Sequence, residues 1–396
     1  MRRLAFSAIA LTLSATVTYF TAGNSSGLFT VLLPTSASAQ SSACAFPTAA
    51  AATPEETAWR LFVAANCPGS GTKVVWENWI EQSQLYPASG TGAAVAAAAR
   101  PAKRLHGSPL AEALAARSRG LRALLKPATD CGPMRGPPSN VIKGATICEE
   151  ARLNPEAATF VTSSNYQIRS GQTAAAQKGT DIEFTAPSIE VKVDWIPGTD
   201  FKPAFTCDSP PKGVHVEEID GTCYAMAGIH ISSKLAKNWI WATFEPQSML
   251  TNPLRCKTFG DCNDPWGSTP ATSSGGTAGF TQLTPALQSL MTQANLAAEF
   301  SNYRLDGVQI DFTTANGGPT YLGNSVIEGE NVGMKKNTAS CITCHSESAI
   351  QKTGTDNIQN IKDMVGPQYK VPAGWIARDF VWSMALACPG GIQDCK

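Results

Sequence analysis

Charged residues are scarce in this chain, and neither sign predominates. They make up 16% of the 396 residues, and 31 Lys and Arg balance 31 Asp and Glu, so the formal net charge is zero. A surface that binds nucleic acid normally carries an excess of basic side chains. The balance therefore gives no reason to expect a nucleic-acid partner. Because hydrophobic residues reach 43%, a sizeable packed core is expected and disorder is not.

Long apolar runs are missing beyond the N-terminus. No later stretch approaches the roughly 20 apolar residues that a membrane-spanning helix needs. The first 39 residues resemble a Sec-type signal peptide, with two arginines after the initial Met, an apolar stretch at 4–18 and a cleavage site after Ala39. These features predict export to the periplasm. Because residues 27–33 add a second apolar run, an uncleaved anchor is the alternative, and only then would a membrane be a partner.

Motifs of several enzyme classes are missing where they would have to lie to work. No G-x-S-x-G, P-loop or G-x-G-x-x-G motif occurs in the structural context that it requires. Hydrolase, nucleoside triphosphatase and dinucleotide-binding functions therefore have no support.

Cysteine, by contrast, is abundant, and the twelve cysteines fit an oxidising compartment. Two belong to the motif described next, and the other ten suffice for five disulfide bonds. Spacing alone does not determine connectivity. Pairing nearest neighbours predicts Cys44–Cys67, Cys131–Cys148, Cys207–Cys223, Cys256–Cys262 and Cys388–Cys395. A zinc site would need the C-x2-C pair twice, and the sequence has it once.

The most specific motif is Cys341-Ile342-Thr343-Cys344-His345. Thiols at positions i and i+3 lie near each other on a helical turn, so both can bond to one haem, and the following His ligates the iron. The motif predicts one haem c, attached through Cys341 and Cys344, with His345 as the proximal ligand. The alternative is a redox dithiol, which prefers a strand-to-helix context that residues 337–340 do not offer.

The ligand on the other side of the iron has several candidates. Electron-transfer cytochromes usually use Met or His there. Met364 lies in a loop-like context 19 residues after His345, and Met384 lies 39 residues after it. The helical spacing of Met384 with Ile376 and Phe380 also fits the core face of a C-terminal helix. Met334 closely precedes the motif.

Only four histidines are present. His106 and His215 are expected to be solvated. His230 lies in an expected strand that is followed by an aromatic strand. It could be the distal ligand, an acid–base group above an open iron site, or a hydrogen-bonded structural residue. Four tryptophans could line a haem pocket or belong to the core: Trp239, Trp241, Trp375 and Trp382.

Hydrophobic periodicity predicts an α+β fold. Thr53 as N-cap and Pro54 at the first position predict a helix over 53–65. Alternation from Ile189 to Trp195 predicts a half-buried strand. Further strands are expected at 224–232, 239–245 and 303–312, helices at 93–125 and 283–300, and loops at 253–279 and 317–337. After the signal peptide at 1–39, we expect a large disulfide-braced mixed body at 40–315 and a mostly helical, cytochrome c-like haem segment at 316–396.

Several segments together resemble a group of large exported bacterial single-haem cytochrome c family proteins. Besides the haem motif they are AWRLFVAAN at 58–66, GIHI at 228–231, NWIWATFE at 238–245, LGNSVIE at 322–328 and DFVWS at 379–383. The resemblance implies haem c, export and a redox role, and implies no substrate. It also favours His230 over Met384 as an iron ligand, because the position that matches Met384 accepts other aliphatic residues.

The leading functional hypothesis is one-electron transfer between redox partner proteins that the sequence does not identify. A carrier needs little more than a haem wrap of about a hundred residues, whereas most of this chain precedes the motif. The alternatives are a haem-dependent oxidoreductase, peroxidase-like or oxygenase-like, and a haem-based protein that binds or senses a ligand. An open sixth position of the iron would distinguish these alternatives from a carrier.

Overall fold

The computed structural model describes residues 41–71, 73–86, 105, 131–137, 140–247, 262–269, 281–335, 338–357 and 364–387. They belong to one compact unit, Gln40–Lys396. The predicted signal peptide at 1–39 lies outside the described residues, as does the predicted helix at 93–125 apart from Leu105. The predicted boundary between 315 and 316 stays a prediction.

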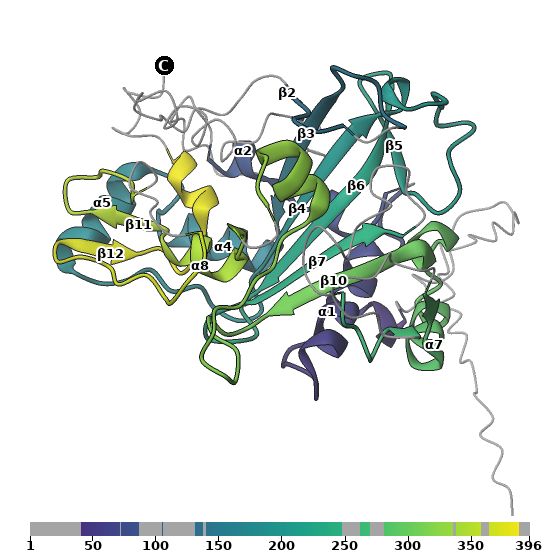
Figure 1. The fold of residues 1–396 in the computed structure, drawn as a ribbon. Coiled ribbons are helices and arrows are strands. Elements are labelled where there is room, and N and C mark those ends of the chain that lie inside the picture. The colour runs from purple at the N-terminus through teal and green to yellow at the C-terminus, as the bar shows by residue number, and fades with distance from the viewer. Residues whose placement is uncertain are drawn as a thin grey trace, which may run out of the picture. The chain divides into compact units, whose positions relative to one another are not determined.

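A large antiparallel sheet forms the centre of this unit (Figure 1). Its strands follow the order β1-β3-β4-β6-β7-β10, with β2 paired to β3 and β5 paired to β6. Their bounds are Ile80–Glu81 for β1, Gly132–Pro133 for β2, Thr146–Leu153 for β3, Ile189–Pro197 for β4, Val216–Ile219 for β5, Thr222–Ser233 for β6, Ile240–Pro246 for β7 and Tyr303–Gln309 for β10. The four predicted strands are confirmed as β4, β6, β7 and β10.

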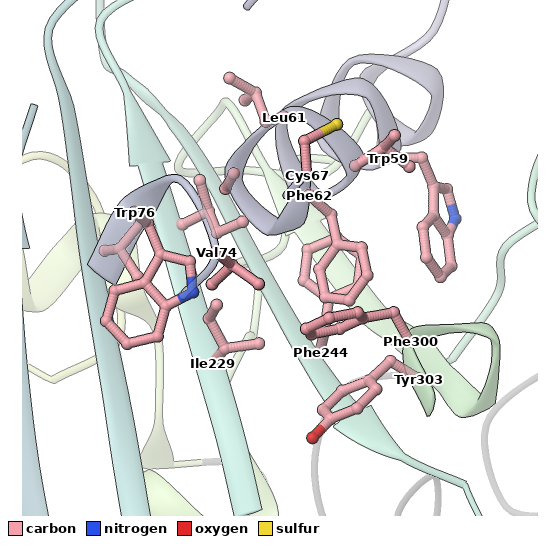
Figure 2. Close-up of a cluster of buried hydrophobic side chains, with 14 of the residues drawn as sticks. Trp59, Leu61, Phe62, Cys67, Val74, Trp76, Ile229, Phe244, Phe300 and Tyr303 are labelled. Atoms are coloured by element: carbon pink, nitrogen blue, oxygen red, sulfur yellow. The ribbon is translucent and has the colours of Figure 1, made fainter. Parts of the chain in front are cut away.

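One face of the sheet is apolar and packs against helix α1, Pro54–Asn66. The predicted start of this helix is confirmed, because Thr53 Oγ1 accepts a hydrogen bond from the Glu56 N–H at 3.2 Å. Phe62 of α1 lies among the rings of Phe244, Phe300 and Tyr303, with centroids 4.5 to 6.1 Å apart (Figure 2). Burying such rings removes much apolar surface from water, so this face supplies the main core.

The other elements are short. They are η1 Ser42–Cys44, η2 Trp76–Asn78, α2 Gln82–Leu85, α4 Pro155–Ser163, α5 Arg169–Lys178, η3 Gly198–Asp200, β8 Ser268–Thr269, β9 Gln282–Leu283, α7 Pro285–Gln293, η4 Ala298–Asn302, η5 Ser325–Val332, α8 Cys341–Ser346, β11 Ala349–Gln351, β12 Trp375–Ala377 and η8 Trp382–Leu386. The helix predicted at 283–300 is thus divided into α7 and η4. Within the predicted loop at 317–337 lies η5, a π-helix.

The predicted α+β fold class is wrong, because the described chain is organised around the antiparallel sheet and has few helices. The described part of 316–396 is not a mostly helical cytochrome c-like segment either. It contains η5, the six-residue α8, the β11–β12 pair and the 3-10 helix η8. Ile376, Phe380 and Met384 have helical spacing, but they lie in β12, in a turn and in η8. All three side chains pack in one apolar cluster. Their spacing of four residues therefore reflects tertiary packing and not a helix.

Disulfide bonds join Cys44 to Cys67, Cys131 to Cys148 and Cys207 to Cys223, which confirms three predicted pairs. Cys262 is also disulfide-bonded. Its predicted partner Cys256 and the predicted pair Cys388–Cys395 lie outside the described residues. Disulfides of this kind indicate an oxidising, exported environment. None of the helices in the described ranges is long and apolar enough to cross a membrane.

Candidate functional site

Helix α8 places both cysteines and the histidine of the motif on one side. Because an α-helix turns by about 100° per residue, Cys341, Cys344 and His345 share a face, and Thr343 and Ser346 lie on the opposite one. The thiols of Cys341 and Cys344 are buried and form no disulfide. On the opposite face, Thr343 donates a hydrogen bond to the Gly366 carbonyl at 2.9 Å. The segment around Gly366 therefore lies behind the motif.

The environment of the thiols differs from that of a redox dithiol. Burial raises the pKa of Cys344 to about 12 and that of Cys341 well above its usual range. The Glu328 carboxylate raises both values further. Reactive dithiols instead lie in electropositive surroundings that lower the pKa of a thiol. The arrangement therefore disfavours the redox-dithiol alternative.

His345 is held in one tautomer. Its Nδ1 lies 2.8 Å from the Phe380 carbonyl oxygen, which can only accept, so Nδ1 carries the proton. Burial lowers the pKa of His345 to about 4, so the ring is neutral at pH 7 and Nε2 is free to bind a metal. The ring packs against Trp241 with centroids 4.4 Å apart. Trp382 donates to the Cys344 carbonyl at 3.1 Å, so two of the four candidate tryptophans contact the motif.

A strained turn fixes the Phe380 carbonyl. Asp379 and Phe380 have φ values of 47° and 70°, which residues other than glycine rarely adopt. The Val381 N–H closes the turn with a 3.0 Å hydrogen bond to the Arg378 carbonyl. The Asp379 carboxylate accepts from Lys234 Nζ at 2.6 Å and from the Phe184 N–H at 2.8 Å. These contacts hold the turn in the conformation that meets His345.

The second face of the sheet brings polar side chains towards the motif. Lys192 of β4 is the cross-strand partner of His230 of β6, which in turn pairs with Thr243 of β7. Trp241 lies two residues from Thr243 and therefore on the same face. Diagonal neighbours on a sheet face are roughly 7–8 Å apart, so His230 lies beside the tryptophan that packs against His345.

Charged groups surround His230, and we name Glu149, Lys192, Asp194, His230 and Glu328 the sheet-face cluster. His230 Nε2 lies 3.2 Å from Glu328 Oε2, close enough for an ion pair but without the angle of a hydrogen bond. Lys192 Nζ lies 3.0 Å from Glu149 Oε2. Asp194 Oδ2 accepts a hydrogen bond from the Asn331 side chain at 2.8 Å.

The charges of this cluster act on one another and on the motif. Burial alone would raise the pKa of Glu328, but His230 and Lys192 outweigh it, so this pKa is lowered. Burial, aided by Glu149, raises the pKa of Asp194 well above its usual range. Besides burial, Lys192 and His230 lower the pKa of His345. The sheet-face cluster therefore lies within electrostatic reach of the motif at 341–345.

The π-helix η5 positions Glu328. Its N-cap Asn324 donates to Thr243 Oγ1 at 2.8 Å, and the Asn324 N–H donates to Glu328 Oε2 at 2.6 Å. This is a capping box with one extra residue, as suits the wider turn of a π-helix. A Cβ on Gly228 would lie 2.7 Å from Asn324 Oδ1, so the glycine allows η5 to approach β6. Sequence reasoning missed Glu328 and Lys192. The register that places Lys192 opposite His230 cannot be obtained from the sequence, and the segment around Glu328 resembles a loop.

The methionine candidates lie in three different segments. Met364 is half-buried and lies two residues before Gly366, whose carbonyl accepts from Thr343. Met384 is completely buried in η8. It belongs to the apolar cluster that also contains Cys341 and Trp241. Half-buried Met334 follows the end of η5.

The prediction that His215 is solvated is wrong. It is 7% exposed and lies on the apolar side of the sheet, with Nε2 3.1 Å from Glu77 Oε1 and its ring stacked on Phe300. The polar partner satisfies the imidazole, which lets a loop histidine become part of the core. His106 lies outside the described residues.

Comparisons with protein-family models, with curated proteins and with solved structures found no match for this chain. Within the described ranges, no three His, Cys, Asp or Glu side chains are grouped so that they could hold a metal ion. A C-x-x-C-H motif does not need such a group of three, because haem c attachment uses two thiols and one imidazole. Free Cys341 and Cys344, with His345 beside them on α8, have the donor chemistry that haem c requires.

Proposed function

We propose that this protein is an exported c-type cytochrome with one haem c, attached through Cys341 and Cys344 and ligated by His345. The observation that carries the proposal is the state of the three side chains. Two free thiols share a helix face with an imidazole whose Nδ1–H is bonded to a carbonyl oxygen. Haem proteins use such a hydrogen bond to fix the tautomer and orientation of the ligating histidine.

The role that we propose is one-electron transfer between redox partner proteins in the periplasm. When bound, the haem supplies a redox-active iron. The chain sets its environment through the burial of α8, the contact of Trp241 with His345 and the Phe380 carbonyl. We further propose that a Sec-type signal peptide, cleaved after Ala39, directs export. The three disulfides support an exported location.

A second candidate is a haem-dependent oxidoreductase, peroxidase-like or oxygenase-like, or a haem-based protein that senses a ligand. The sheet-face cluster favours it. Taking charged groups such as Glu149 and Asp194 out of water is costly, and a simple electron carrier has no use for acid–base groups such as His230 beside its haem.

The attachment is tested by substitution in a host that matures c-type cytochromes. We expect the wild-type chain to retain haem after denaturing electrophoresis. The double variant Cys341→Ser/Cys344→Ser should lose all covalent haem, and His345→Ala should keep the covalent bonds but lose the normal axial ligation in its absorption spectrum. Haem that stays covalently bound in the double serine variant would contradict the proposal. His215→Gln, on the opposite face of the sheet, is the histidine control.

A further inference from the structure

We propose that two tryptophans, Trp241 and Trp239, carry electrons between the haem motif and the surface of the protein at Tyr166. The route is a continuous series of aromatic rings in contact, and it serves a one-electron donor or acceptor. The inference rests on the proposed haem attachment and deepens it, because it names the residues through which electrons enter and leave.

The inner end of the route is a ring contact with His345. The centroids of the His345 and Trp241 rings lie 4.4 Å apart, and the Trp241 indole N–H donates to the Asn238 carbonyl at 2.9 Å. This bond holds the indole in place. Because an imidazole that ligates iron shares electron density with the metal, a ring packed on it is coupled to the metal as well. The start of the route is therefore fixed by His345 alone.

From Trp241 the rings continue to the surface. The next rings are Trp239 at 6.3 Å between centroids, Phe184 at 5.8 Å, Phe160 at 4.6 Å and Tyr166 at 5.7 Å. Trp239 and Phe184 are buried, whereas Phe160 and Tyr166 are half-buried. Rings at such distances pack against one another. Electron transfer weakens steeply across each gap through space, so rings in contact are a better path than the aliphatic core around them.

The conformation of Trp239 indicates that this position serves more than packing. Its φ is 62°, a value that a bulky residue rarely adopts. Its buried indole nitrogen forms no well-aligned hydrogen bond with the described residues, although Asp379 lies near it. Buried tryptophans usually find such a partner. Backbone strain and an unsatisfied donor both cost stability, and costs of this kind are concentrated at functional sites.

A second series of rings leads from Trp241 through Phe380 to half-buried Phe312, with centroids 6.1 and 6.3 Å apart. Beyond Trp241 it contains only phenylalanines, which are much harder to oxidise than tryptophan or tyrosine. The series through Trp239 has an indole in its middle and a phenol at the surface. We therefore assign electron transfer to the series through Trp239.

The test uses the full-length, haem-loaded protein with a ruthenium photosensitiser on the variant Ser163→Cys, because Ser163 is exposed and lies close to Tyr166 in sequence. A light flash and a soluble electron acceptor oxidise this label. One electron then passes from the ferrous iron to the label, so the iron becomes ferric, the label is reduced, and no bond forms or breaks. We expect transient absorption to detect a tryptophan or tyrosine radical before the iron is oxidised.

Two substitutions interrupt the route independently. Trp239→Phe keeps a ring but removes the indole, and Phe184→Leu opens a gap between rings, so each should slow the transfer severalfold and diminish the radical signal. Either variant suffices if the other does not fold. The haem absorption spectrum and denaturant unfolding show whether each variant is loaded and folded.

The control is a second label on Ala315→Cys, in the exposed turn that follows Phe312. Both substitutions should leave its transfer rate unchanged. The inference is overturned if neither substitution slows transfer from the label at 163, or if both labels are slowed equally, which would show a general effect on the haem. Loss of covalent haem in the wild type would be a failure of the proposed attachment, and the haem stain reports it separately.

Discussion

At the scale of single residues, the orientation of His345 depends on one carbonyl group and therefore on the turn that presents it. Phe380 accepts from Nδ1 only because two successive residues adopt positive φ values. Asp379 stabilises that backbone through Lys234 and through the Phe184 N–H. A hydrogen bond at the second nitrogen also raises the basicity of a ligating imidazole, so this turn affects the chemistry as well as the geometry.

Substitutions at Asp379 test this dependence. Asp379→Ala leaves the buried Phe184 N–H without its acceptor and places alanine at φ 47°, so we expect it to lower the free energy of unfolding by about 3 kcal/mol. Asp379→Asn keeps an acceptor, and asparagine tolerates the left-handed region. It loses only the ion pair with Lys234, so the free energy of unfolding should fall by about 1 kcal/mol. Urea denaturation of both variants measures the difference. Equal losses would show that the turn does not depend on this side chain as argued.

At the scale of elements, the site depends on how closely η5 approaches the sheet. Three hydrogen bonds hold its first turn, from Asn324 to Thr243, from Asn324 to Glu328 and from Ser325 to Glu245. Gly228 leaves room for this approach. The buried Glu245 carboxylate, 2% exposed, also faces the positive end of the helix, where an anion is favourable. The position of Glu328 beside His230 follows from this docking.

Gly228→Ala tests the docking directly. The new Cβ would lie 2.7 Å from Asn324 Oδ1, so the Asn324 side chain must leave the position in which it donates to Thr243 and caps η5. We expect a loss of about 2 kcal/mol in the free energy of unfolding, as for other overpacked sites. Gly132→Ala is the matched control, because a Cβ there meets nothing within 4 Å. Denaturant unfolding that is unchanged in Gly228→Ala would contradict a close approach between η5 and β6.

The same elements show how far the sequence could predict this structure. Local sequence signals sufficed to predict α1 and β4. Thr53 and Pro54 mark the start of α1 within one turn, and apolar and polar residues alternate along β4. Nearest-neighbour pairing also sufficed for the three disulfides of the described residues. The π-helix η5 escaped prediction because its contacts come from β6 and β7, far away in sequence.

The prediction of a mostly helical C-terminal segment was wrong for a related reason. Ile376, Phe380 and Met384 share one apolar cluster through tertiary packing, and their spacing imitates a helix that does not form. Glu328 could not be linked to His230 without the register of the sheet. The segments at 228–231, 238–245, 322–328 and 379–383 contact one another or α8, although they lie far apart in sequence.

At the scale of the whole compact unit, one face of the sheet packs the main core and the other face carries the candidate functional side chains. Its apolar face packs α1 and the rings around Phe62 (Figure 2). Its other face carries the sheet-face cluster, whose ion pairs offset the cost of desolvation only in part. Groups that stabilise little and lie beside a candidate cofactor site are the ones expected to serve function.

This division predicts opposite outcomes for two substitutions on the same sheet. Phe62→Ala removes a completely buried ring in contact with Phe244 and Tyr303, so the free energy of unfolding should fall by about 3–5 kcal/mol. His230→Gln keeps a polar side chain at a half-buried position and should cost less than about 1 kcal/mol. Denaturant unfolding of both variants without haem gives the comparison. A His230→Gln loss as large as that of Phe62→Ala would mean that the charged face belongs to the folding core, and its charges would then need no functional explanation.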